Sequence, residues 1–306
     1  MKPVFFYSPL LSSFFFPPSG IISIMLSLVP LEPVDYLVIG HAAHDLTPSG
    51  ARLGGTVAFS ALTARALGLR VGIVTSAGAD ISLAALDGIP TITIPSEYST
   101  TFENIYSAEG RKQILHHHAT PIDFVHVPEI WKRAGIIHLG PIANEVSSIL
   151  PKDFSPDLLG LTAQGWMRGW DESGRVHSIK WEDQFALEAA GAVAISLEDA
   201  GGDMERVERL AQHTRILAVT EGAAGCVLHW HGDRRRINAP KFPEIDATGA
   251  GDIFAAAFFI RLYTTRDPWE AARFATHLAS HSITRVGLDG IPTEQEIQSC
   301  LVEVLS

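Results

Sequence analysis

Cysteine is scarce in this sequence. Cys226 and Cys300 are the two cysteines among 306 residues, and they lie far apart, which argues against a disulfide framework and a cysteine metal site. Basic residues are also few: the sequence has 23 Lys and Arg residues against 34 Asp and Glu residues, which gives a net charge of −11. This balance disfavours nucleic acid and anionic membranes as main partners. We therefore expect a cytoplasmic protein with no nucleic-acid partner.

A long hydrophobic run is lacking as well. The apolar stretch over 4–16 is broken by Pro9, and a second stretch covers 21–31. Neither reaches the roughly 20 residues of a membrane span, so a membrane partner is not expected. We interpret residues 1–33 as an extension outside the domain, with Met25 or a nearby position as the natural start; membrane or export targeting is the alternative.

The rest of the chain has the pattern of an α/β protein. Residues 35–40 form a predicted buried strand that ends at a glycine, 56–67 a helix opened by two glycines, and 71–75 the next strand. This strand–loop–helix–strand order is the unit of a parallel sheet. Other short apolar segments end in polar or small residues and are predicted strands: 136–141, 158–161, 192–196 and 216–220. No linker divides the chain after Val34, so we expect one domain over 34–306.

Residues 91–122 are rich in β-forming side chains. The segments 101–106 and 112–118 alternate in polarity around a short turn, which predicts a hairpin. The second segment ends in three consecutive histidines, 116–118. Three adjacent strand residues cannot all face one ion, since successive side chains point to opposite faces. We expect a solvated strand here rather than a metal site.

The chain is organised around the stretch DATGAGD at 246–252. Gly249 and Gly251 allow the backbone to turn sharply, and the amides at the start of the following apolar helix are suited to bind an anion such as phosphate. Asp252 would stand in the first helical turn, within reach of a substrate hydroxyl. The alternative is a glycine-rich turn that caps an ordinary buried helix, with Asp252 as a favourable first-turn charge. No GxxxxGK[ST] loop occurs in the sequence.

DATGAGD followed by a helix of small residues resembles the C-terminal signature of the ribokinase-like (PfkB) family of carbohydrate and nucleoside kinases. The resemblance implies a doubly wound, mostly parallel sheet with helices on both faces and a small β lid, with lid strands near 43–53 and 91–122. It also implies that Asp252 is the catalytic base and that the amides of Gly249, Ala250 and Gly251 form the anion hole.

Two further segments resemble the family's nucleotide site. TEGAAG at 220–225 is similar to its phosphate segment, although by pattern alone it is a turn between strands. SLED at 196–199 stands where the family carries NxxE, which implies that Asp199 orders Mg²⁺ with a carboxylate one methylene shorter. The resemblance implies ATP as the donor. Its expected contacts are Thr220, Gly222, Gly225, Asp246, Thr248 and Gly287.

The acceptor end is similar to the inositol kinase-like branch of the family. Phe59 replaces the asparagine of many sugar kinases, and QGWMR at 164–168 resembles a stretch of that branch. The expected acceptor contacts are Asp45, Gly54, Gly55, Asn104, Gln164 and Arg168. The implied function is phosphoryl transfer to a small polyol or sugar, with myo-inositol as the best candidate, by a monomer or homodimer. A nucleoside or another sugar is the alternative acceptor, and a non-catalytic ligand-binding relative is the alternative of another class.

Overall fold

The computed structural model of the chain describes residues 31–47, 50–107 and 110–302. The secondary-structure elements within these ranges belong to the unit Glu32–Ser306. The apolar run over 4–16 and nearly all of the run over 21–31 lie outside the described residues, so the interpretation of 1–33 as an extension stays a prediction. Within the described ranges, none of the helices combines the length and the apolar character that crossing a membrane requires.

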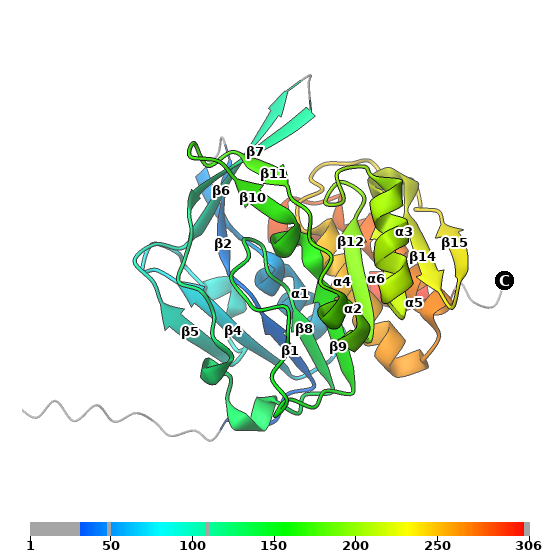
Figure 1. Cartoon of the computed structure of the whole chain (residues 1–306), viewed down its shortest axis with the longest axis horizontal. Helices are drawn as coiled ribbons and strands as arrows, with labels where there is room; N and C mark the ends of the chain where they lie inside the picture. The colour runs from blue at the N-terminus through cyan, green and yellow to red at the C-terminus, as the bar shows by residue number, and fades with distance from the viewer. Residues whose placement is uncertain (1–30, 48–49, 108–109, 303–306) are drawn as a thin grey trace, which may run out of the picture. The chain divides into compact units, whose positions relative to one another are not determined.

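Nine strands in the described part of the chain form one mixed sheet, in the order β15-β14-β13-β12-β9-β8-β1-β4-β5 (Figure 1). The strands from β13 to β5 run parallel, and β14 and β15 are antiparallel additions at one edge. The bounds are β1 (Tyr36–Ile39), β4 (Val71–Ala77), β5 (Thr91–Pro95), β8 (Ile136–Leu139), β9 (Leu158–Thr162), β12 (Ala192–Ser196), β13 (Ile216–Thr220), β14 (Cys226–Trp230) and β15 (Asp233–Ile237).

Helices cover both faces of this sheet. One face packs against α1 (Thr56–Ala66), α4 (Ala250–Thr265), α5 (Pro268–Ser282) and α6 (Glu294–Val302). The other face packs against α2 (Gln184–Ala189), α3 (Met204–His213) and the 3₁₀ turns η2 (Phe124–His126), η3 (Glu129–Trp131) and η4 (Ala163–Met167). The remaining 3₁₀ turns are η1 (Ala84–Leu86), η5 (Gly222–Ala224) and η6 (Gly287–Gly290). The predicted doubly wound α/β architecture is therefore confirmed.

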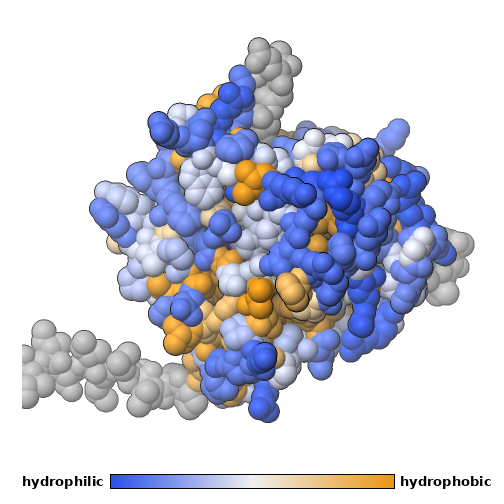
Figure 2. Space-filling model, viewed as in Figure 1, coloured by the Kyte–Doolittle hydropathy of each residue, from blue (hydrophilic) through white to orange (hydrophobic). Residues whose placement is uncertain are grey.

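Burial explains why the sequence forms these layers. All four residues of β1 are fully buried, as expected for a parallel strand covered on both faces. The run 253–260 of α4 is buried all round, because this helix lies between the sheet and neighbouring helices. In contrast, α3 buries Val207 and Leu210 and presents a hydrophilic outer surface (Figure 2).

A second sheet, called here the small sheet, has the order β3-β2-β6-β7. Its strands are β2 (Ala43–Thr47), β3 (Gly50–Gly54), β6 (Thr100–Ser107) and β7 (Gly110–His117), and it projects at the top of Figure 1. The short strands β10 (Arg168–Trp170) and β11 (Val176–Ser178) form a separate hairpin.

The expectation that residues 91–94 belong to a lid is wrong. These residues form β5, which pairs in parallel with β4 at the edge of the main sheet. The connection through η1 returns the chain beside β4, and Ile94 is buried in the core on that sheet. Alternation of β-forming residues predicts a strand but does not say which sheet the strand joins.

Candidate active site

A cavity of about 780 Å³ lies where several strands and helices end. Its walls come from the carboxyl ends of β12 and β13, the small sheet, and the amino ends of α1 and α4. Open α/β sheets bind ligands at this edge. Most of the predicted site residues line the cavity: Asp45, Gly55, Asn104, Gln164, Arg168, Asp199, Thr220, Gly222, Thr248, Gly249, Ala250, Gly251 and Asp252.

The turn before α4 approaches Phe59 very closely. Gly249 has a left-handed backbone with φ of 78° and precedes the first residue of the helix. A Cβ at this position would lie 2.3 Å from the ring of Phe59. Glycine is therefore required here both by the backbone angle and by the contact. The amide of Ala250, which was expected to face an anion, donates to Ala247 O at 3.2 Å.

Asp252 lies in the first turn of α4 and reaches the cavity. Its Oδ1 accepts a hydrogen bond from Thr56 Oγ1 at 2.7 Å. Burial raises the pKa of this carboxyl to about 6; the Thr56 hydrogen bond and the charge of Arg168 lower it, while Asp45 and Asp199 raise it. The group is therefore mainly ionised at pH 7, yet it is a stronger proton acceptor than an exposed aspartate.

Asp199, which also lines the cavity, is held in place by a hydrogen-bond network. Its Oδ2 accepts hydrogen bonds from Ser196 Oγ at 2.6 Å and from Ser196 N at 3.1 Å. Gln164, predicted as an acceptor contact, donates to Asp199 Oδ1 at 3.3 Å. Serine thus replaces the expected asparagine while still orienting the carboxylate.

The cavity can hold Mg²⁺ only if a bound phosphate group supplies further ligands to the ion. Among the described residues, no group of three or more His, Cys, Asp or Glu side chains is arranged to hold a metal ion. Mg²⁺ keeps several waters and commonly takes one or two protein carboxylates together with phosphate oxygens. Asp199, with the neighbouring wall residue Glu198, suits that second arrangement.

The small sheet supplies polar groups to the cavity wall. Gln113 Nε2 donates to Asn104 Oδ1 at 2.9 Å, and both side chains line the cavity. The Arg168 guanidinium lies over the ring of Phe102, 5.6 Å from its centre. Gly54 does not line the cavity; a Cβ there would fall 1.9 Å from Asp45 Oδ2, so this glycine makes room for the Asp45 carboxylate.

Three predicted nucleotide contacts lie outside the cavity wall. Gly225 has φ of 96° and closes the turn between β13 and β14, where a Cβ would lie 2.1 Å from Ile237 O. Asp246 accepts hydrogen bonds from Thr248 N at 2.9 Å and from Gly287 N at 3.0 Å. Asp246 and Gly287 therefore tie two loops together beside the cavity rather than line it.

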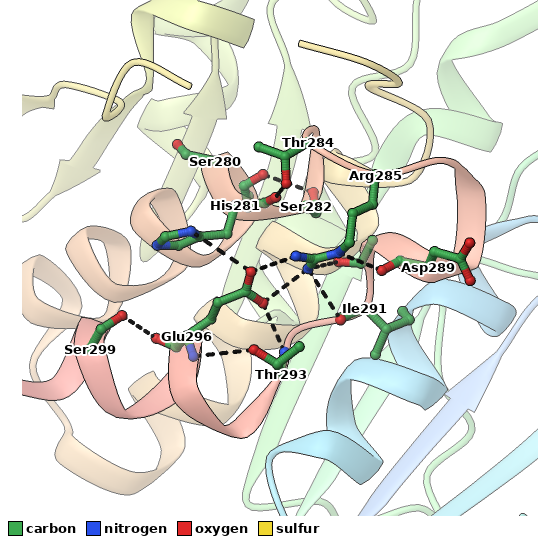
Figure 3. Close-up of polar contacts among 12 residues, drawn as sticks. Ser280, His281, Ser282, Thr284, Arg285, Asp289, Ile291, Thr293, Glu296 and Ser299 are labelled. Carbon is green, nitrogen blue, oxygen red and sulfur yellow. Dashed lines mark hydrogen bonds and ion pairs between the residues drawn. The ribbon is translucent and has the colours of Figure 1, made fainter. Parts of the chain in front are cut away.

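The loop that contains Gly287 is anchored by a cluster that the sequence did not reveal. Arg285 Nη1 and Nη2 donate to the Glu296 carboxylate at 2.6 and 2.9 Å, and Arg285 Nε donates to Asp289 O at 2.6 Å (Figure 3). This pair joins α6 to the loop, and Asp246 continues the connection to the turn before α4. Arginine and glutamate eleven residues apart carry no recognisable motif.

Glu145 is a second residue that sequence reasoning missed. Its carboxylate is buried and accepts hydrogen bonds from the amides of His41 at 2.8 Å, Ile142 at 3.0 Å and Ala143 at 2.7 Å. It thereby fixes the two loops that follow β1 and β8.

The histidines at 116–118 do not converge on one point. His116 Nε2 contacts Glu103 Oε2 at 2.8 Å, His117 stacks on Tyr98, and His118 Nε2 contacts Ala143 O at 2.8 Å. All three side chains are exposed. The exposure of the three histidines agrees with the predicted solvated segment, although β7 ends at His117 and its Leu115 is buried.

Comparison with known proteins adds a family match. Residues 188–295 match the model of the pfkB family carbohydrate kinases. A ribokinase of Bacillus subtilis (strain 168) is 37% identical over 97 residues, which span 31% of this chain and 32% of that protein. An inositol 3-kinase of Oryza sativa subsp. japonica is 25% identical over 286 residues, 84% of this chain and 70% of that protein. A cytidine kinase of Thermococcus kodakarensis is 26% identical over 275 residues, 83% of this chain and 98% of that protein.

Solved structures show the same fold. A pyrophosphate-dependent kinase in the ribokinase family, complexed with a pyrophosphate analog and myo-inositol, has a TM-score of 0.72 at 20% identity and covers 87% of this chain and 99% of that chain. An Arabidopsis thaliana ribokinase complexed with ribose and ATP has a TM-score of 0.66 at 18% identity over 89% of this chain and 99% of that chain. At these identities the likeness establishes a ribokinase-like fold.

Proposed function

We propose that the chain is a carbohydrate kinase of the pfkB family, whose model matches residues 188–295, and that it transfers the γ-phosphoryl group of ATP to a hydroxyl of a small polyol, with myo-inositol as the best candidate. The observation that carries the proposal is the position of Asp252. This carboxylate lies in the first turn of α4, directly after the glycine turn, and faces a cavity large enough for a donor and an acceptor.

The proposed reaction is an in-line displacement at the γ-phosphorus. The acceptor oxygen forms a bond to phosphorus, the bond between phosphorus and the bridging oxygen of ADP breaks, and the acceptor proton passes to Asp252. Phosphoryl transfer has a loose transition state, so the protein contributes mainly by positioning the reactants and stabilising charge. The backbone amides of Gly249 and Gly251, which line the cavity at the start of α4, are the groups proposed to stabilise that charge.

Asp199 is the proposed magnesium-ordering residue. Mg²⁺ would neutralise the phosphate oxygens of ATP, and Asp199, oriented by Ser196 and Gln164, would hold its water shell. Thr220, which ends β13 and pairs with Ser196 on β12, and Gly222 in η5 are the proposed donor contacts.

A polyol acceptor is favoured by the chemistry of the acceptor end. Each ring hydroxyl both donates and accepts a hydrogen bond, and Asp45, Asn104 and Arg168 together offer acceptors and donors in one wall. The similarity to the rice inositol 3-kinase over most of the chain supports the same choice. A nucleoside is the second candidate, because Phe59 and Phe102 offer aromatic faces and a cytidine kinase is similar over 83% of the chain.

ADP release with Mg-ATP across inositols, pentoses, hexoses and nucleosides tests the acceptor. We expect the highest kcat/KM for myo-inositol, because a site that pairs every hydroxyl rejects analogues that lack one. Reactions without an acceptor serve as the control for ATP hydrolysis. A nucleoside that exceeds myo-inositol in kcat/KM by more than about tenfold would overturn the polyol assignment and leave the kinase assignment standing.

A further inference from the structure

Thr56 is a buried hydroxyl residue that the proposed reaction has not yet used. It is the first residue of α1, is 1% exposed, and donates from Oγ1 to Asp252 Oδ1 at 2.7 Å. The preceding Gly55 has φ of 85°, and a Cβ there would lie 2.5 Å from His41 O. This close approach of the loop after β1 sets the backbone position from which Thr56 reaches Asp252.

The methyl group of Thr56 is packed where a side chain at position 140 would otherwise lie. A Cβ at Gly140 would fall 2.5 Å from Thr56 Cγ2 and 3.3 Å from Thr162 Oγ1. Because a β-branched residue in a helix has few side-chain rotamers, this packing directs the hydroxyl toward Asp252. One turn along α1, Ser60 Oγ donates to the backbone oxygen of Asp252 at 3.3 Å. Two hydroxyls of α1 therefore hold Asp252, one at its side chain and one at its backbone.

We propose that Thr56 is a positioning residue that engages Oδ1 of Asp252 and thereby reserves Oδ2 for the proton of the acceptor hydroxyl. That Asp252 receives its proton from an acceptor hydroxyl rests on the proposed function. The hydrogen bond between Thr56 and Asp252 rests on geometry alone. A donated O–H bond favours the ionised carboxylate, as does Arg168, and both oppose the effects of burial and of the carboxylates Asp45 and Asp199. Thr56 thus keeps the base ionised as well as oriented.

The test compares Thr56→Val, which keeps the shape and removes the donor, with Thr56→Ser, which keeps the donor. The Asp252 carboxyl is titrated by carbon-13 NMR, with Asp252→Asn identifying its signal, and the pH profile of kcat/KM is recorded for each protein. Thr56→Val is expected to move the Asp252 midpoint and the acidic limb of the profile upward by about one to two pH units. Thr56→Ser is expected to leave the midpoint close to that of the wild type.

A wild-type midpoint in Thr56→Val, or an equal shift in Thr56→Ser, would overturn the proposed role of Thr56. If Thr56→Val does not fold, Thr56→Ala removes the donor without adding an atom and carries the same expectation. If the midpoint shifts as expected but the wild type transfers no phosphoryl group to any acceptor, the proposed function fails while the contact between Thr56 and Asp252 stands.

Discussion

Replacing Asp252 by asparagine is expected to lower kcat by at least about 10²-fold, the smaller end of the loss that follows removal of a general base. Asparagine keeps the size of the side chain and can still accept the Thr56 hydrogen bond, but it cannot accept the acceptor's proton. Affinity for ATP is expected to remain nearly intact, because the proposed donor contacts lie elsewhere in the cavity. Steady-state kinetics and calorimetric titration with ATP check both parts; a near-wild-type kcat would contradict the role of Asp252.

Thermal unfolding of Asp252→Asn provides the control for folding. Burial raises the pKa of Asp252 in the folded protein to about 6 from its ordinary 3.8. The folded state therefore binds the Asp252 proton more tightly than the unfolded state. Protonation of Asp252 stabilises the folded state fully below about pH 4, and this stabilisation is lost as pH rises through 6. At pH 8 the buried carboxylate of Asp252 destabilises the wild type by up to about 3 kcal/mol. The variant lacks this charge and should melt at a higher temperature than the wild type. The two melting temperatures should converge near pH 4.

Replacing Gly249 by alanine is expected to damage both catalysis and stability. The residue has φ of 78°, and an added Cβ would lie 2.3 Å from the Phe59 ring, so either the turn or the ring must move. Left-handed strain together with overpacking is expected to destabilise the fold by about 2–4 kcal/mol. Displacement of the amides at the start of α4 should lower kcat by about 10²-fold, the cost of losing one such donor. Chemical denaturation and steady-state kinetics measure the two effects.

Gly251→Ala is the matched control for this substitution. Among the described residues, no heavy atom beyond the adjacent residues and the backbone of the same helix lies within 4 Å of a Cβ added at Gly251, which lies within α4. Alanine is favoured over glycine in a helix, so this variant should be at least as stable as the wild type. If Gly249→Ala were as stable as Gly251→Ala, the close approach of Phe59 to the turn would not be the constraint described here.

Much of the fold could be predicted because parallel strands covered on both faces have continuous apolar runs. The predicted strands at 35–40, 136–141 and 216–220 correspond to β1, β8 and β13. An apolar run does not show which strand another strand pairs with. The segment that forms β5 was therefore predicted in the lid, whereas it pairs with β4 in the main sheet. β15, with the sequence DRRRI, was missed because four of its five residues are exposed at the sheet edge and lack an apolar pattern.

The candidate site could be predicted where glycine turns and strand ends marked it. Segments around Asp45, Asn104, Asp199, Thr220 and Asp252 are distant in sequence yet line one cavity. The sequence does not show which side chains in the cavity hydrogen-bond to each other, because this depends on the direction of each side chain as well as on the position of its residue. Gln164 turns to Asp199, and Thr56 turns to Asp252. Their roles as contacts to bound ligands remain proposals.

Phosphorus-31 NMR of the wild-type protein with Mg-ATP and myo-inositol directly tests phosphoryl transfer from ATP to the polyol. We expect the γ-phosphorus signal of ATP to decline while ADP and one phosphomonoester appear in equal amounts. We also expect Asp252→Asn to form this product at least about 10²-fold more slowly. Persistent ATP with every acceptor, or release of inorganic phosphate alone, would contradict the account. Transfer from pyrophosphate in place of ATP would contradict the proposed donor.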